Sequence, residues 1–227
     1  MTAANNKPII SDPINIVYEN KIFAVIDKPA GIACHQDDGL LSVLAKQQER
    51  FKGATLVSRL DRDTSGLLTI ALSPKHHQEI EEKVESKIYL ALLAGIPEPS
   101  SGFINESLPV IGKNNLPHLS KDAQNSSSEY KTIETFGSLA LVQVKLHSGR
   151  KHQIRRHMAN FGWHIVGDPI YGRRNVNKRA KTEFGLTRQF LHSHRLSVRE
   201  NNDIVTELTA QLPDDLASML KILKGNS

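Results

Sequence analysis

The segment from Ser58 to Gly66 (SRLDRDTSG) carries two acids and two arginines and runs directly into the apolar stretch Leu67 to Leu72. A carboxylate in such a loop can act as a nucleophile or as a general base, and an arginine beside it can bind an anion. Loops that rigid strands hold in place often carry catalytic groups. Taken alone, the same segment could equally be a solvated surface turn.

A second segment, His147 to Met158 (HSGRKHQIRRHM), concentrates basic residues at a predicted helix. The apolar residues that recur there at helical spacing, and so predict one buried face, are Ile154, Met158 and Phe161. Arg155 adjoins that face, near the boundary between core and solvent. Arg156 is predicted to point toward solvent or a ligand.

Arg150 and Lys151 stand where the helix is predicted to begin. Positive charge is unfavourable at that end of a helix, whereas an anion is favoured there, so these residues make sense if they meet phosphates. The histidines of the segment recur in steps of five, which do not share a helix face, and no acidic ligand lies between them. We therefore expect no metal site.

Composition sets wider limits. The chain has 227 residues, 39% of them hydrophobic, with a net charge of +5 and a single cysteine, Cys34. One cysteine excludes a disulfide framework and a cysteine-based zinc cluster, and the modest basic excess fits a polyanionic partner. No apolar run approaches the roughly 20 residues of a membrane span. These features predict a cytoplasmic protein with a flexible polar tail at residues 1–13.

The elements that must position these residues are mostly strands. Period-two and continuous apolar patterns predict strands near residues 14–19, 22–26, 67–72, 87–95, 128–133, 139–146 and 190–196. Helices are predicted near 41–51, from Ser73-Pro74 to Val84, across the basic segment, and from Pro213 onward with a stripe of buried leucines. Residues 114–128 are predicted to form a mobile excursion. Taken alone, the basic run 173–181 would be a solvated loop; beside the preceding helix it is predicted to extend a basic track for a nucleic-acid backbone.

Several of these segments together resemble the RNA pseudouridine synthase family, in the branch typified by the ribosomal and tRNA uridine synthases A and C. RLDxxTSGLL at 59–68 is similar to its catalytic signature, except that Ser58 stands where the family usually has histidine. The other matching blocks, in family order, are KPxG at 28–31, KxYxAxxxG at 87–95, GRxHQIRxH at 149–157, VGDPIYG at 166–172 and LHxxxL at 191–196.

The resemblance implies an α+β fold: a bent, mostly antiparallel mixed sheet flanked by helices, with an active-site cleft across its middle. It places one catalytic domain at residues 14–223. It also implies an enzyme that isomerises uridine to pseudouridine in tRNA or rRNA. Such an isomerisation has no redox step and no external group, so we expect neither a cofactor nor a nucleotide, and RNA as the partner of a monomer.

The resemblance also suggests roles for residues. Asp61 aligns with the catalytic carboxylate, Tyr89 with the active-site tyrosine, and Arg155 with an arginine that pairs with the carboxylate; Asp63 falls in the variable part of the motif. The candidates for RNA contact are Lys28, Arg59, Arg150, Lys151, His152, Arg156, Arg173 and Arg174. Whether the carboxylate attacks the base, attacks the sugar or removes a ribose proton stays open.

Two other functions fit the same residues. A protein of this fold could bind RNA and assist its folding without catalysis, although the intact Asp61, Tyr89 and Arg155 favour an enzyme. A glycosylase that releases its base would use similar carboxylate chemistry and would be recognised by free uracil. Neither the RNA nor the uridine that is modified can be read from the sequence.

Overall fold

A computed structural model describes residues 13–35, 38–110, 123–200 and 204–225. Its strands are β1 (Asn15–Glu19), β2 (Phe23–Lys28), β3 (Thr55–Leu56), β4 (Ser65–Ala71), β5 (Val84–Ala94), β6 (Ser101–Pro109), β7 (Ala123–Phe136), β8 (Leu139–Leu146), β9 (His164–Ile165), β10 (Leu191–Arg199) and β11 (Val205–Thr209). Its α-helices are α1 (Leu40–Gln47), α2 (His77–Lys83), α3 (Gln153–Asn160), α4 (Arg174–Phe184) and α5 (Asp214–Gly225). Single 3₁₀ turns occupy Glu49–Phe51 and Pro74–His76.

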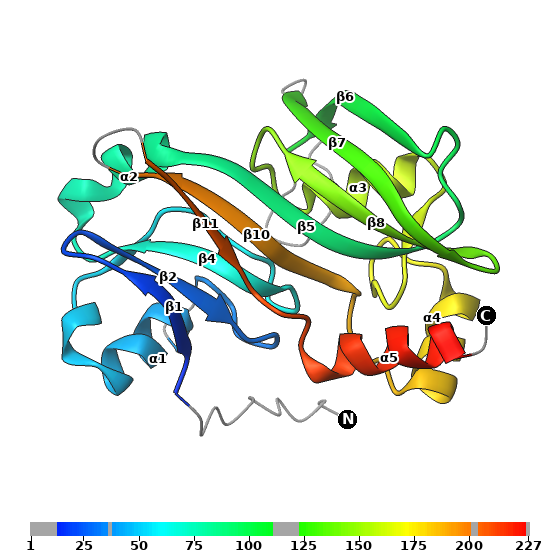
Figure 1. The fold of residues 1–227 in the computed structure, drawn as a ribbon, viewed down its shortest axis with the longest axis horizontal. Coiled ribbons are helices and arrows are strands. Elements are labelled where there is room, and N and C mark those ends of the chain that lie inside the picture. The colour runs from blue at the N-terminus through cyan, green and yellow to red at the C-terminus, as the bar shows by residue number, and fades with distance from the viewer. Residues whose placement is uncertain (1–12, 36–37, 111–122, 201–203, 226–227) are drawn as a thin grey trace.

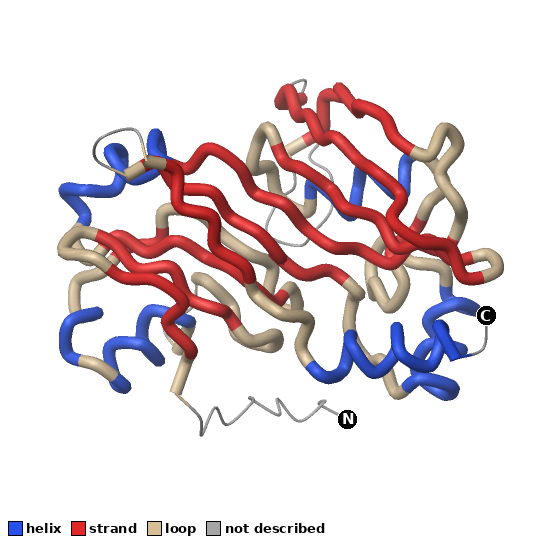
Figure 2. The backbone as a smooth tube through the Cα atoms, in the orientation of Figure 1, coloured by secondary structure: helices blue, strands red, loops and turns tan. Residues whose placement is uncertain are grey.

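The strands form one long sheet in the order β1-β2-β4-β10-β5-β8-β7-β6, with β3, β9 and β11 pairing onto β4, β5 and β10 (Figure 1). Only β4 and β10 run parallel, and the other pairings are antiparallel. The expected mixed, mostly antiparallel sheet with flanking helices is therefore confirmed (Figure 2).

The parallel pair depends on one glycine of the Ser58–Gly66 segment. Gly66 has φ +109°, and a Cβ there would lie 2.2 Å from the carbonyl oxygen of Ser193. No other residue type allows this close approach of β10. Gly66 thus lies inside β4, where it brings the two halves of the sheet together.

Both faces of the second half of β5, at the centre of the sheet, are buried. Tyr89, Ala91 and Leu93 face a core cluster that α1 and α3 complete, whereas Leu92 and Ala94 face a second cluster that includes residues of α4 and α5. A third cluster lies under α2 and β11. Because α1 and α3 cover opposite ends of one face, the middle of that face is left for a site.

Three expectations about local structure are wrong. Residues 174–184 form helix α4 rather than a basic loop, because Val176, Ala180 and Phe184, four apart, pack on the second cluster. Residues 123–128 belong to β7, which pairs with β6 from Ala123 to Lys131; the rest of the expected excursion, 114–122, lies outside the described residues. Val84 begins β5 instead of closing a helix.

The bounds of other elements also differ from the expectation. The first helix ends at Gln47 and is followed by the 3₁₀ turn. Of the expected tail at 1–13, all but Pro13 lies outside the described residues. In the described part of the chain, no helix has both the length and the apolar character that a membrane crossing would need.

Candidate active site

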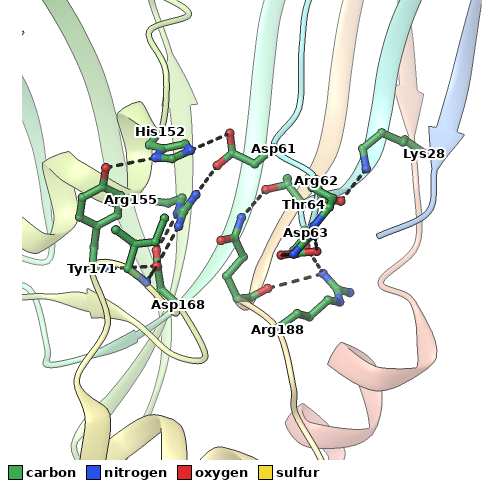
Figure 3. A network of polar contacts seen from close by, with 12 residues as sticks. Lys28, Asp61, Arg62, Asp63, Thr64, His152, Arg155, Asp168, Tyr171 and Arg188 are labelled. Carbon is green, nitrogen blue, oxygen red and sulfur yellow. Dashed lines mark hydrogen bonds and ion pairs between the residues drawn. The ribbon is translucent and has the colours of Figure 1, made fainter. Parts of the chain in front are cut away.

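Asp61 lies in the loop between β3 and β4, at the middle of the sheet (Figure 3). The loop is fixed by contacts from distant segments. Gly31 N–H donates to the carbonyl of Arg62 (2.8 Å), and Gln189 Nε2 donates to the hydroxyl of Thr64 (2.7 Å). The carboxylate therefore extends from a backbone with little freedom.

Two buried or half-buried cations donate hydrogen bonds to backbone carbonyls of the same loop. Lys28 Nζ donates to the carbonyls of Pro29 (2.8 Å), Ile32 (3.0 Å) and Arg62 (3.0 Å). Arg188 Nη1 donates to the carbonyl of Asp63 (3.1 Å), and its other nitrogens bind Asp215 of α5.

The expected RNA contact of Lys28 is therefore wrong. Its side chain is fully buried, and burial lowers its pKa to about 8. An ammonium with three carbonyl acceptors is a structural clamp and has no donor left for a phosphate.

Arg155 lies between two carboxylates (Figure 3). Its Nη1 donates to Asp61 Oδ2 (2.7 Å), while Nε and Nη2 donate to Asp168 Oδ2 (2.7 Å) and Oδ1 (2.9 Å). The predicted pairing of Arg155 with Asp61 within about 4 Å is confirmed. The bidentate pair of hydrogen bonds, however, goes to Asp168, whereas Asp61 accepts a single hydrogen bond through Oδ2.

Asp168 was missed as a site residue because Gly-Asp-Pro reads as an ordinary turn. Its side chain is 1% exposed and also accepts hydrogen bonds from the backbone N–H groups of Ile170 and Tyr171. Burial favours its neutral form, but Arg155 and these donors outweigh burial and lower the pKa of Asp168. Burial likewise disfavours the charge on Arg155, yet both carboxylates raise its pKa overall. The pair stays charged.

A histidine faces the other oxygen of Asp61, and a tyrosine contacts that histidine (Figure 3). His152 Nε2 lies 3.8 Å from Asp61 Oδ1, and His152 Nδ1 lies 3.1 Å from the hydroxyl of Tyr171. Burial lowers the pKa of His152, although the charge of Asp61 opposes this. The only signal for Tyr171 in the sequence was its place in the 166–172 block.

Tyr89 stands on β5 beside this group and is 6% exposed. Burial raises its pKa to about 12, against a smaller opposite effect of the Ser193 hydroxyl. The phenol is therefore neutral at physiological pH.

A pocket of about 510 Å³ opens in front of Asp61 and Tyr89. Its walls come from both ends of the sheet: Cys34 and Ser58 on one side, and the turn from Ser148 to His152 on the other. The cleft expected across the middle of the sheet is thus present, and Ser58 lies in its wall. The cationic residues lining it are Arg59, Arg62, Lys87, Arg150 and Lys151.

The remaining RNA-contact candidates lie elsewhere. Arg173 and Arg174 are exposed at the start of α4, outside the pocket wall, and Arg173 donates to the carbonyl of Gly162. Arg156 is only 9% exposed, so its expected outward orientation is wrong. Helix α3 packs against β6, β7 and β9, which buries six consecutive residues from Gln153 to Met158. Phe161, expected in the apolar stripe, is 45% exposed just past the helix.

His157 is fully buried and lies between two serines. Ser126 donates to the carbonyl of Glu106, so it accepts from His157 Nε2 (2.9 Å), and His157 Nδ1 accepts from Ser128 (3.0 Å). Among the described residues, no three His, Cys, Asp or Glu side chains are grouped so that they could hold a metal ion.

Several known proteins are similar to this chain. Residues 22–160 match the model of the RNA pseudouridylate synthase family. A protein of Chloroflexus aurantiacus, named an RNA pseudouridine synthase, is 37% identical over 88% of this chain, which spans 66% of that relative. The ribosomal large subunit pseudouridine synthase D of Pseudomonas aeruginosa is 32% identical over 93% of this chain and 72% of its own length.

Solved structures agree on the fold. The human RNA pseudouridylate synthase domain containing 4 superposes with a TM-score of 0.75 and 25% identity, covering 92% of this chain and 93% of its own. The human RNA pseudouridylate synthase domain containing 1 has a TM-score of 0.68 and 23% identity, covering 93% and 95%. The matched segment contains Asp61, Tyr89 and Arg155, and most of the chain aligns with proteins named for one activity. The chain therefore belongs to the RNA pseudouridylate synthase family.

Proposed function

We propose that this RNA pseudouridine synthase converts specific uridines in structured RNA to pseudouridine, with Asp61 as its catalytic carboxylate. One observation carries the proposal. Asp61 lies in the wall of a pocket of about 510 Å³, with one carboxylate oxygen held by the buried Arg155 and with Tyr89 on the same wall. A positioned carboxylate and a neutral phenol are the groups that the reaction needs.

The reaction breaks the bond between N1 of uracil and the ribose, turns the base, and joins carbon 5 to the same ribose carbon. The proton on carbon 5 then leaves, and N1 gains one, so the product is an isomer of the substrate. A carboxylate can assist by covalent catalysis or by removing a proton. Asp61 Oδ2 is engaged by Arg155, so Oδ1 is the oxygen available to the substrate.

Tyr89 acts on the base. Its ring offers a face on which the uracil can pack, and a phenol with a pKa of about 12 keeps its proton until a transfer step requires it. Arg59, exposed at the pocket wall, binds a flanking phosphate or fills the space that the base vacates. The target base must leave its stack, which costs a few kcal/mol unless the RNA is already looped.

Arg150 and Lys151 contact the RNA backbone at the pocket wall, and Arg173 and Arg174 extend the contact along α4. The relatives named for the large ribosomal subunit make rRNA the first substrate class to test, and tRNA the second. The catalytic domain spans residues 14–223 and works as a monomer in the cytoplasm.

The test maps pseudouridines in RNA from cells with and without this protein, and then measures turnover in vitro. Asp61→Asn should abolish pseudouridine formation while RNA still binds. Asp63→Asn is the matched control and should keep most activity, because the Asp63 carboxylate pairs with Arg62 and does not line the pocket. Turnover by the Asp61 variant would overturn the assignment, and RNA binding without any turnover in the unmodified protein would indicate a non-catalytic RNA-binding protein.

A further inference from the structure

The imidazole of His152 joins Tyr171 to the carboxylate of Asp61. Nδ1 lies 3.1 Å from the Tyr171 hydroxyl, and Nε2 faces Asp61 Oδ1 at 3.8 Å. The two rings meet edge to face, with centroids 5.7 Å apart. His152 therefore approaches the oxygen of Asp61 that Arg155 leaves free.

The backbone of His152 is held in an uncommon conformation. Its φ of +55° lies in the left-handed region, where it is the only residue other than glycine in the described part of the chain. This region is unfavourable for most L-residues and persists where surrounding structure fixes it, often at functional sites. The turn directs the ring inward, so that the side chain is only 8% exposed.

The groups that face the two ring nitrogens select one tautomer. The Tyr171 hydroxyl makes no other hydrogen bond among the described residues, so its proton is free to go to Nδ1. A carboxylate facing Nε2 requires the proton of the ring to be on that nitrogen. Tyr171 then donates to His152, and His152 presents an N–H to Asp61.

Tyr171 is itself anchored by the acid that holds Arg155. Asp168 Oδ1 accepts from the Tyr171 backbone N–H (3.0 Å) and from Arg155 Nη2 (2.9 Å). The guanidinium of Arg155 also lies over the Tyr171 ring, 5.2 Å from its centroid. The buried carboxylate of Asp168 thus positions both Arg155 and the Tyr171–His152 pair, and each of these approaches a different oxygen of Asp61.

We propose that His152 is a positioning residue that Tyr171 fixes in its Nε2–H tautomer, and that it orients the reactive oxygen of Asp61 rather than holding the RNA. The proposal rests on the proposed function of Asp61. In the free protein the Nε2 to Oδ1 distance exceeds a hydrogen bond, as is common before substrate binds. When the base enters, a small rotation of the carboxylate brings Oδ1 to the N–H.

The charges around the ring decide how it responds to pH. Asp61 and Asp168 favour the imidazolium, whereas burial, Arg155 and Lys151 disfavour it, and Tyr171 donates to the neutral ring. Removing the Tyr171 hydroxyl takes away a hydrogen bond to the neutral form, so the pKa of His152 should rise. As the pH falls, a variant without this hydroxyl would then lose the neutral ring, and the activity that depends on it, at a higher pH than the unmodified protein does.

The experiment compares Tyr171→Phe with Tyr130→Phe in single-turnover assays on an RNA that the unmodified protein converts. Tyr171→Phe keeps the ring and should lower the rate roughly fivefold, the size of one hydrogen bond between neutral groups, with RNA affinity unchanged. Its rate should also fall at a higher pH than that of the unmodified protein. Tyr130→Phe removes a hydroxyl bonded to the Pro99 carbonyl, outside the pocket wall, and should leave the rate unchanged.

Two further measurements separate the outcomes. NMR of the imidazole nitrogens should show the Nε2–H tautomer for His152 in the unmodified protein and a mixture of tautomers in Tyr171→Phe. The His152 resonance is assigned by its loss in His152→Asn, because asparagine tolerates the left-handed backbone conformation. His152→Asn should slow turnover without weakening RNA binding. Weaker binding at an unchanged rate, or a Tyr171→Phe variant with normal rate, pH profile and tautomer, would overturn the inference. Absence of turnover in the unmodified protein would instead refute the proposed function.

Discussion

Arg155 must satisfy two carboxylates from one side chain. Its fork binds Asp168, and its remaining nitrogen binds Asp61. Arg155→Lys keeps the charge but cannot span both acids, so one buried carboxylate loses its partner. We expect turnover to fall far more than RNA affinity, by about 100-fold or more, as for a misplaced catalytic group.

The control for this variant is Arg50→Lys, since Arg50 pairs with Glu19 at the surface, away from the pocket. Single-turnover rates and equilibrium binding should be measured on the same RNA. If Arg155→Lys turns over normally, one ammonium suffices to hold Asp61, and the fork has no role in the site.

Tyr89 allows packing to be separated from proton transfer. Tyr89→Phe keeps the ring and removes only a hydroxyl whose pKa is raised to about 12. If the phenol takes part in proton transfer, the rate should drop severely, on the order of 100-fold or more, while binding survives. A rate equal to that of the unmodified protein would leave Tyr89 with a stacking role alone.

At the scale of elements, Lys28 at the end of β2 fastens two loops together. Its ammonium binds two carbonyls within the β2–α1 connection, those of Pro29 and Ile32, and that of Arg62 beside Asp61. Lys28→Met fills the space but leaves the carbonyls of Pro29 and Ile32 without their donor, whereas that of Arg62 keeps the bond from Gly31 N–H. Buried unsatisfied acceptors cost about 1 to 3 kcal/mol each, so the variant should lose several kcal/mol of folding stability.

Urea unfolding of Lys28→Met and of Lys75→Met, whose lysine is exposed, would measure the difference. Where the variant remains folded, its turnover should fall because the Asp61 loop loses a support. A Lys28 variant as stable as the control would show that the clamp contributes nothing to the fold.

The sequence predicted the strands with strong apolar patterns and, through the family resemblance, the pairing of Arg155 with Asp61. It did not predict Lys28 as buried, since a lysine before Pro-x-Gly reads as exposed and its third acceptor, Arg62, is 34 residues away. The basic residues of helix α3 predict an amphipathic helix with one solvent-exposed face. The sheet and the Tyr171 loop cover that face, and only tertiary contacts reveal this.

Across the whole molecule, cations at the pocket wall and on α4 should govern RNA affinity. If Arg150 and Arg174 each neutralise a phosphate, Arg150→Gln and Arg174→Gln should each lower the slope of log affinity against log salt by about 0.7 to 0.9. Lys224→Gln removes a charge of the same sign from α5, where it pairs with Glu134, and should leave the slope unchanged. Equal slopes in all variants would mean that neither arginine contacts a phosphate.

His192 makes the folding stability of the protein sensitive to acid. It is fully buried on β10, where Nε2 donates to the Ala210 carbonyl (3.2 Å) and Nδ1 accepts from the Ser65 hydroxyl (3.0 Å). Burial lowers its pKa to about 4, whereas the unfolded chain binds the same proton near pH 6.5. The contribution of the neutral His192 to folding stability is therefore fully present above about pH 6.5 and is lost as the pH falls toward 4.

The loss attributable to His192 should approach about 3 kcal/mol, since each pKa unit corresponds to about 1.4 kcal/mol. Urea unfolding at about pH 7.5 and about pH 4.5 should show it in the unmodified protein and in His35→Gln, which changes an exposed histidine, but not in His192→Gln. His157, whose pKa burial also lowers, should leave a smaller loss in every variant. If His192→Gln lost as much stability in acid as the unmodified protein, the buried ring would not be the group that titrates, and the contact of β10 with β4 at Ser65 would owe nothing to its neutral form.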